Sequence, residues 1–220
     1  MTSSGAKVAV LAGASGLVGR ELAQLLCESA AYSAVHSLVR RAAADDAKPA
    51  KLREHIVSFD SLPALPACDD VYVALGTTIK VAGSEAAFRR VDHDYVISVA
   101  RAGRGAGASR LAIVSALGAD AKSRVFYNRV KGEMEAAVVT LGYASVIIVQ
   151  PSLLLGDREG LGQPKRSGEV WATRLLTPLA ALIPAGIRPV RAHEVARALL
   201  ERTLTAAPGT SIISSRDLHA

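Results

Sequence analysis

Short apolar runs alternate with longer amphipathic segments along most of this 220-residue chain. The segments between the apolar runs are predicted to be helical at 16–29, 85–103 and 124–141. This βαβ rhythm predicts an α/β fold, a doubly wound parallel sheet with helices on both faces. The predicted strands are KVAVLAG (7–13), AVHSLVRR (34–41), EHIVSFD (54–60), DVYVALG (70–76), RLAIVSALG (110–118) and ASVIIVQP (144–151).

The length predicts a single domain, residues 1–220, with a full hydrophobic core. After Gly156 the pattern loosens, and residues 157–220 are expected to form a small helical region on the substrate side. That region contains two predicted helices (169–184 and 191–204) and a last strand (210–215). Loops are expected at 42–51 and 61–70, and GRGAG (103–107) is expected to be a helix stop rather than an RNA-binding tract.

Charge and cysteine usage limit the class of protein. The net charge of +6 comes from scattered Lys and Arg without interleaved aromatic residues, which favours a small-molecule substrate and argues against nucleic acid. Cys27 and Cys68 lack metal-ligand spacing and indicate reduced thiols in a cytoplasmic protein without a metal site. The uncharged stretch 136–156 is long enough to cross a membrane, but Gly142 and Pro151 divide it into helix, turn and strand. No membrane segment and no export signal are expected.

The segment LAGASGLVG (11–19) follows the first predicted strand directly and opens the first predicted helix. Its glycines have the spacing G-x-x-G-x-x-G. The first allows a tight turn, the second lets the backbone approach a phosphate, and the third lets the helix pack on the sheet. The alternative is a tight turn without a ligand. The predicted phosphate-binding residues are Gly13, Ser15, Gly16, Leu17, Val18 and Gly19.

The second predicted strand ends with Arg40 and Arg41, and no acid follows until Asp45. In an NAD site an acid at this point binds the ribose 2′-hydroxyl, whereas guanidinium groups suit a 2′-phosphate. The sequence therefore predicts NADP(H) over NAD(H), with two solvated arginines as the alternative. Further cofactor contacts are expected where the third and fourth strands end, at Asp60, Gly76, Thr77 and Thr78.

Ser115 ends the fifth predicted strand, and Tyr127 and Lys131 follow it one helical turn apart. Residues four apart share a helix face. A lysine ammonium near a tyrosine hydroxyl favours the phenolate, which a general acid or base for a carbonyl/alcohol pair requires. Chance could also produce this spacing, so its context between strand and helix decides the interpretation.

These motifs, in this order, resemble the short-chain dehydrogenase/reductase superfamily. The segments 74–96, 115–138 and 150–159 are similar to its atypical branch, which contains the Tat-interactive-protein oxidoreductases and bacterial proteins often named nucleoside-diphosphate-sugar epimerase-like. The resemblance covers about Lys7 to Leu200. It implies a Rossmann fold, NADPH binding, Pro151 and Ser152 near the nicotinamide, and a homodimer.

Two departures from the superfamily bear on function. Many members carry an asparagine that completes a proton-relay water site, and Asp92 stands where it would fall. A carboxylate cannot donate as an amide does, which calls a relay through this point into question. The region after Gly156 is also short for the substrate domain of a sugar-nucleotide epimerase, which argues against that activity.

We therefore expect an NADPH-dependent oxidoreductase acting on a carbonyl-type substrate, with Tyr127 as proton donor, Ser115 on the substrate oxygen and Lys131 on the nicotinamide ribose. The alternative is a non-catalytic NADP(H)-binding regulator or redox sensor that acts through a protein partner. The segment around His93 is expected to be a solvated helix face, His193 and Glu194 to mark a helix start, and Trp171 to line the substrate cleft or fill the C-terminal core.

Overall fold

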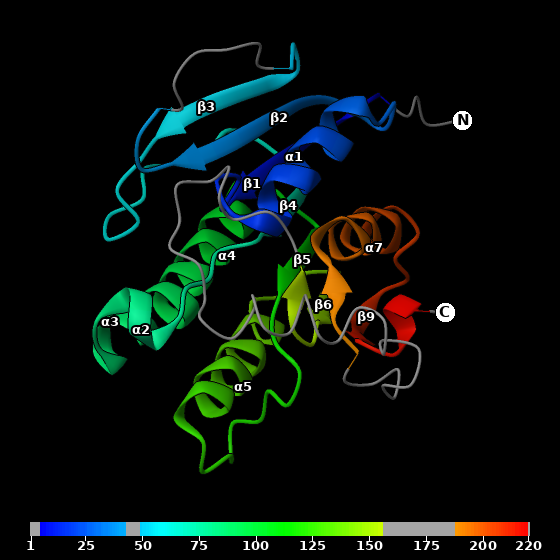
Figure 1. The fold of residues 1–220 in the computed structure, drawn as a ribbon. Helices are drawn as coiled ribbons and strands as arrows, with labels where there is room; N and C mark the ends of the chain where they lie inside the picture. Colours follow the sequence, from blue (N-terminus) through cyan, green and yellow to red (C-terminus); the bar gives the residue numbers. More distant parts are fainter. Residues whose placement is uncertain (1–4, 43–48, 156–187, 220) are drawn as a thin grey trace.

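The structure is a computed structural model that describes residues 5–42, 49–155 and 188–219. Within these residues seven strands form one parallel sheet in the order β3-β2-β1-β4-β5-β6-β9 (Figure 1). Chain order reverses between β1 and β4, and ligands of such sheets bind at the carboxyl ends of the strands at that point. The strands are β1 (Lys7–Ala12), β2 (Tyr32–Val39), β3 (Leu52–Ile56), β4 (Asp70–Val73), β5 (Arg110–Val114), β6 (Ser145–Gln150) and β9 (Gly209–Ser214).

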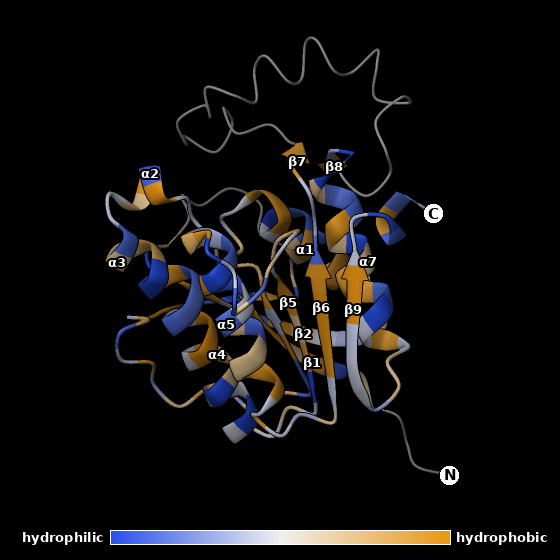
Figure 2. Cartoon of the chain, turned by 90° about the horizontal axis from the view of Figure 1, so that it is seen from below, coloured by the Kyte–Doolittle hydropathy of each residue, from blue (hydrophilic) through white to orange (hydrophobic). Residues whose placement is uncertain are grey.

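Helices cover both faces of the sheet, so the predicted doubly wound α/β fold is confirmed. Alternate residues of β1 divide between two buried apolar clusters, with Leu11 in one and Val10 in the other. The strands are largely apolar, and polar residues gather on the outward sides of the helices (Figure 2). The helix layers are α1 (Leu17–Glu28) with α7 (Ala192–Leu204), and α4 (Tyr95–Gly105) with α5 (Phe126–Val139) (Figure 1).

A buried polar network lies where β2, β4 and β5 begin. Asp70 is fully buried and accepts hydrogen bonds from Arg110 Nε and Nη2 at 2.5 and 2.8 Å. The Tyr32 hydroxyl also donates to Asp70 and contacts the Tyr72 hydroxyl at 2.7 Å. Burial, with the neighbouring Tyr72 and Asp70, raises the pKa of Tyr32, so this phenol stays protonated. The network holds the amino ends of the strands, away from the glycine turn.

The segment 85–103, predicted as one helix, is interrupted by a π-helical turn. Helix α3 (Glu85–Arg89) leads into the turn η1 (Arg90–Asp94), which continues into α4. Phe88, Asp92 and Val96, four residues apart, all face the interior and are at most 1% exposed. The expectation of a solvated face is therefore wrong for Asp92. This residue lies on the inward-facing side of the helix, although the residues around it in the sequence are charged.

Other predicted segments have clear outcomes. In the described part of the uncharged stretch, residues 136–155, the end of α5 is followed by a turn at Gly142 (φ +76°) and by β6, as predicted, and then by a short strand at Leu154–Leu155. GRGAG forms the end of α4 and the turn that follows it. None of the helices in the described ranges is long and apolar enough to cross a bilayer. The predicted helix 169–184, with Trp171, and also Asp45 lie outside the described residues.

Short elements complete the described chain. A two-stranded parallel pair, which the sequence did not predict, lies beyond the carboxyl end of β6 (Figure 2). These short elements are β7 (Leu154–Leu155) and β8 (Val190–Arg191), α2 (Ile79–Ala82) and the 3₁₀ turn η4 (Asp217–His219).

Candidate functional site

The turn from β1 to α1 is packed so closely that two of its glycines cannot carry a side chain. A Cβ on Gly13 (φ +97°) would lie 2.6 Å from the Ala74 carbonyl, and one on Gly19 would lie 1.9 Å from the Gly13 oxygen. At Gly16 the nearest atom would be 3.4 Å away, so the protein itself leaves room there. Gly16 is also the N-cap of α1 and offers no side-chain cap. The first-turn amides of α1 can therefore bind an anionic group.

Two adjoining cavities, of about 470 and 480 Å³, lie at the carboxyl ends of the strands. They share Gly16 and residues 74–77 and therefore form one cleft over the crevice between β1 and β4. We call them the Ser115 half and the Arg40 half. Of the residues expected at the site, those that line the Arg40 half are Gly13, Ser15, Gly16, Arg40, Gly76, Thr77 and Thr78. Those that line the Ser115 half are Gly16, Leu17, Val18, Gly76, Thr77, Ser115, Tyr127, Lys131, Pro151 and Ser152.

The Arg40 half differs from the expectation in two residues. Arg41 is exposed and lines neither half, and Asp60 does not line the cleft but accepts a hydrogen bond from the Tyr95 hydroxyl at 2.9 Å. The Tyr95 ring stacks on Phe59, with centroids 5.5 Å apart, and both rings line this half. This aromatic pair was not predicted from the sequence. The available signal was an aromatic residue directly before Asp60, where the third predicted strand ends.

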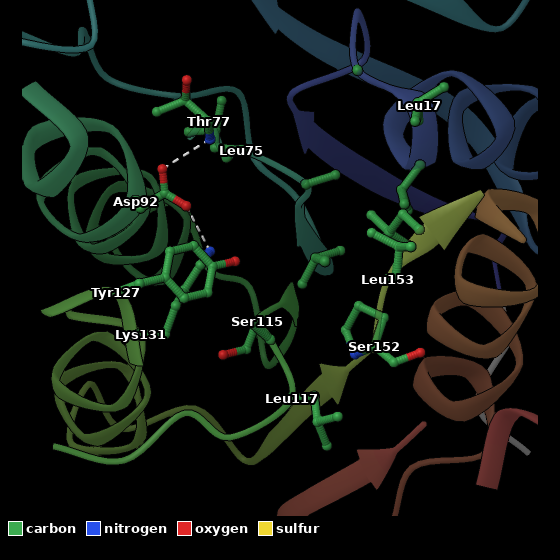
Figure 3. A pocket seen from close by; sticks show the side chains of 18 residues that line it. Leu17, Leu75, Thr77, Asp92, Ser115, Leu117, Tyr127, Lys131, Ser152 and Leu153 are labelled. Atoms are coloured by element: carbon green, nitrogen blue, oxygen red, sulfur yellow. Dashed lines mark hydrogen bonds and ion pairs between the residues drawn. The ribbon is translucent and has the colours of Figure 1, made fainter. Parts of the chain in front are cut away.

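The Ser115 half brings together the serine, tyrosine and lysine singled out in the sequence (Figure 3). Ser115 follows β5 directly, and its buried Oγ has no hydrogen-bond partner among the described residues. Tyr127 lies in the first turn of α5, with its ring centroid 5.3 Å from that of Phe88. Because a buried hydroxyl is costly without a partner, Ser115 is suited to receive one from a bound molecule.

Close packing fixes α5 against the turn that follows β5. A Cβ on Gly132 would lie 2.1 Å from the Ala121 nitrogen, so helix and turn are in direct backbone contact. The Asp120 amide also donates to the Asn128 carbonyl at 3.0 Å. The helix that carries Tyr127 and Lys131 is thereby held to the loop that begins at Ser115.

Lys131 is buried and forms an ion pair with Asp92. Its Nζ lies 2.8 Å from Asp92 Oδ1, and the Thr77 amide donates to Asp92 Oδ2 at 2.8 Å (Figure 3). Burial alone would lower the pKa of Lys131, but the charge of Asp92, with Tyr127 and Glu135, outweighs it and raises the pKa above its ordinary value. The lysine is therefore held as an ammonium by a carboxylate from the π-helical turn.

A second carboxylate lies one turn beyond Lys131 on the same helix. Glu135 is 9% exposed, and both of its oxygens accept hydrogen bonds from Gln150 Nε2 at 3.0 Å. Gln150 ends β6 directly before the Pro151 of the cleft. Tyr127, Lys131 and Glu135 thus form a polar row on the inner face of α5.

The wall of the Ser115 half opposite α5 is largely apolar. Leu117 and Leu153 line it and are 39% and 36% exposed. Ser152 also lines it, but its hydroxyl donates to the Arg188 carbonyl and accepts from Ser215 Oγ at 3.0 Å. Ser152 therefore joins the β6 end to the segment before β8.

Other reactive side chains, among them Cys68 and His193, do not line the cleft. Within residues 5–42, 49–155 and 188–219, no group of three or more His, Cys, Asp or Glu side chains could hold a metal ion. Burial raises the pKa of the Cys68 thiol to about 11. His193 pairs with Glu21 at 3.1 Å, and Glu194 accepts from the Arg191 amide at 2.9 Å, so this segment is a helix start, as predicted.

A parallel sheet in this strand order, with a glycine turn and a cleft at its crevice, defines a Rossmann-type fold of the class that binds nucleotide cofactors. The chain belongs to the NAD(P)H-binding family, whose sequence profile matches residues 13–161. It is 37% identical to "Protein FMP52, mitochondrial" of Eremothecium gossypii over 155 residues, which are 69% of this chain and 68% of that protein.

Solved structures support the same fold at low sequence identity. The oxidoreductase ylbE from Lactococcus lactis superposes with a TM-score of 0.65 at 14% identity, covering 96% of this chain and 95% of that one. UDP-N-acetylglucosamine 4-epimerase from Methanobrevibacter ruminantium superposes with a TM-score of 0.70 at 12% identity, covering 94% and 76%. At this level of identity the similarity concerns the fold alone.

The comparisons correct the expected cytoplasmic location. The relatives from Eremothecium gossypii, Emericella nidulans and Candida albicans are all named as mitochondrial proteins. The expectation rested on Cys27 and Cys68, which lack metal-ligand spacing and were interpreted as reduced thiols, and both are free in the structure. Free thiols indicate a reducing environment, which is a broader class than the cytoplasm.

Proposed function

We propose that this protein is an NADP(H)-dependent oxidoreductase of the atypical short-chain dehydrogenase/reductase type that reduces a carbonyl-type substrate. One observation carries the proposal: the buried Ser115 hydroxyl lacks a partner among the described residues and lines the same pocket as Tyr127 and Lys131 (Figure 3). A substrate oxygen that accepts from both the serine and the tyrosine would satisfy this group.

The chain's own residues have separate tasks in this reaction. A bound nicotinamide supplies the hydride that the carbonyl carbon receives. Tyr127 gives its phenolic proton to the carbonyl oxygen, and Ser115 donates a hydrogen bond to the same oxygen. The Lys131 ammonium, one turn further along α5, stabilises the negative charge left on the phenol oxygen.

Three features of the cleft support a dinucleotide, and one of them favours NADP(H). Gly16 leaves space beside the uncapped start of α1 for a pyrophosphate. The stacked rings of Phe59 and Tyr95 offer an apolar surface for an adenine. Arg40 lines this half, and no acidic side chain among the described residues does, which suits a 2′-phosphate better than a free 2′-hydroxyl.

The lining of the Ser115 half supports an uncharged, apolar carbonyl compound over a nucleotide sugar. Lys131 and Asp92 are the only charged residues in its described lining, and they neutralise each other. A nucleoside diphosphate carries charged phosphates that need cationic or amide donors. Leu117 and Leu153 instead offer exposed apolar surface to a substrate.

The test is NADPH consumption, followed by absorbance, with a panel of aldehydes, ketones and quinones beside UDP-sugars. We expect turnover with an apolar carbonyl compound, reduced at least about 100-fold in Tyr127→Phe with cofactor binding retained. Tyr143→Phe is the matched control, because its hydroxyl donates to the Ala100 carbonyl and does not line the cleft.

A protein that binds NADPH but turns over none of these compounds would contradict the proposal. The same result would favour a regulator or redox sensor, whose partner protein should bind with an affinity that depends on the cofactor. Turnover that survives Tyr127→Phe would instead show that another group donates the proton.

A further inference from the structure

Asp92 is an acidic residue of the cleft that is withdrawn from solvent. It belongs to the lining of the Ser115 half, yet its side chain is only 1% exposed. The π-helical turn η1 carries it inward between α3 and α4, while Asp94, two residues on, is 56% exposed. Burying a carboxylate is costly unless its partners compensate the charge.

Both oxygens of Asp92 meet hydrogen-bond donors. Oδ1 lies 2.8 Å from the Lys131 ammonium, and Oδ2 accepts from the Thr77 amide at 2.8 Å. Neither donor can act as an acceptor in this state. The position therefore demands a side chain that accepts at both ends.

A carboxylate meets this demand and a carboxamide does not. An asparagine has one accepting oxygen and one donating NH₂ group, so in either orientation its NH₂ would face a donor. It would also leave Lys131 buried without its nearest opposite charge. The carboxylate of Asp92 therefore suits its two hydrogen-bond donors. It is not a defective replacement for the asparagine that completes a proton-relay site in many members of the superfamily.

The Thr77 amide belongs to the part of the cleft that both halves share. Residues 74–77 line both cavities, and Gly76 keeps the ion pair close to them. A Cβ on Gly76 would lie 3.4 Å from Asp92 Oδ1 and 4.0 Å from Lys131 Nζ. The carboxylate therefore joins the loop after β4, where a dinucleotide would cross, to the inner face of α5.

We propose that Asp92 is a positioning residue that ties the Lys131 ammonium to the Thr77 amide, so that the lysine and the loop shared by both halves are held as one unit. The contacts themselves do not depend on the proposed function, but their benefit to turnover does. Loss of Asp92 would release the lysine and the loop together.

The charged groups around Lys131 determine how its pKa should change when Asp92 is replaced. Asp92 reaches it from the π-helical turn, Tyr127 and Glu135 act on it from α5, and the loop at Gly76 brings no charge. With Asp92 replaced by asparagine, burial would dominate and Lys131 would lose its proton at a lower pH. Glu135, held by Gln150, would compensate only in part.

The test is a pH titration of the lysine ¹³Cε resonances in the full chain, which has seven lysines. The resonance that is absent in Lys131→Met assigns Lys131. In the wild-type protein we expect it to stay charged beyond about pH 10.4, the ordinary lysine value. In Asp92→Asn the midpoint should fall by about one pH unit or more, and exchange of the Thr77 amide should become faster.

Asp94→Asn is the matched control, because it removes the same charge two residues away on an exposed side chain. It should leave the Lys131 midpoint and the Thr77 amide unchanged. If Lys131 in the wild-type protein titrates at or below the ordinary value, the proposal is overturned without any variant. An equal fall in both variants would also overturn it, since that would be a general effect of charge.

The titration and amide exchange need no turnover, so they remain informative if the oxidoreductase proposal fails. Where turnover is found, Asp92→Asn should weaken NADPH binding about tenfold and move the alkaline limb of the rate profile to lower pH. A variant that loses only thermal stability, with an unchanged Lys131 midpoint and rate profile, would mean that Asp92 is structural alone.

Discussion

The Tyr32 hydroxyl lies 2.5 Å from Asp70 Oδ2, at the amino ends of the strands and away from the cleft. Arg110, only 15% exposed, provides the compensating charge for this buried carboxylate. Arg110→Met should therefore lower the free energy of unfolding by about 3–5 kcal/mol, because it leaves a buried charge unpaired. Urea denaturation checks this. Arg101→Met, the same change on an exposed position of α4, should have little effect, and comparable losses in both would contradict the role of the ion pair.

Alanine substitutions at two glycines of the first turn should affect different properties, stability at Gly19 and cofactor binding at Gly16. Gly19→Ala places a Cβ 1.9 Å from the Gly13 oxygen and should destabilise the fold by at least about 3 kcal/mol. Gly16→Ala meets its nearest atom at 3.4 Å and should change stability by less than about 1 kcal/mol. Gly16→Ala should nevertheless weaken NADPH binding about tenfold, because the phosphate would occupy that space. Calorimetry of unfolding and of binding separates the two effects. Unchanged binding in Gly16→Ala would exclude a pyrophosphate at this turn.

Cofactor preference should depend on Arg40 rather than Arg41. Arg40 lines the cleft and Arg41 does not. Arg40→Ala should weaken NADPH binding about tenfold and leave NADH binding nearly unchanged, since only the former has a 2′-phosphate. Fluorescence titration at two salt concentrations measures both, and the NADPH effect should shrink at high salt. Equal affinity for both cofactors in the wild-type protein, unaffected by Arg40→Ala, would contradict the preference for NADP(H).

A histidine pair at the edge of the sheet should make stability depend on pH. His36 Nδ1 lies 2.7 Å from His55 Nε2, across β2 and β3. Burial, with His55 and Arg53 nearby, lowers the pKa of His36. The folded state then binds fewer protons than the unfolded state, so this contribution is complete above about pH 6.5 and is lost as the pH falls through the lowered pKa. Urea midpoints should drop less steeply on acidification in His36→Asn, whereas His193→Asn, on an exposed side chain, should follow the wild-type protein.

Local spacing and strand order were enough to predict most of the cleft. Gly13 lies where the first strand ends, and Ser115 lies where the fifth ends. Parallel strands bring such ends to one edge of the sheet, and Tyr127 follows Ser115 on the next helix. These residues are close in space because the fold class places them there, which a single sequence can indicate.

The features of the site that the sequence did not predict depend on contacts between segments that are distant in the chain. The role of Asp92 is set by Lys131 and by the Thr77 amide, and neither partner is implied by the residues around it. Arg40 and Arg41 looked equivalent in the sequence, but both lie in the bend that follows β2, and only Arg40 lines the cleft. The prediction of a cytoplasmic location was wrong because free thiols do not distinguish one reducing compartment from another.

The backbone contact at Gly132 packs α5 directly against the turn at Ala121. The helix that carries Tyr127 is consequently positioned by the fold itself. A displacement of about 1 Å in a reacting group can cost about 100-fold in rate, so a helix held in this way would spare the proposed proton donor Tyr127 that cost. Selectivity among substrates would then reflect how each one rests against Leu117 and Leu153, and adaptation to a new substrate would alter those leucines before it altered the helix.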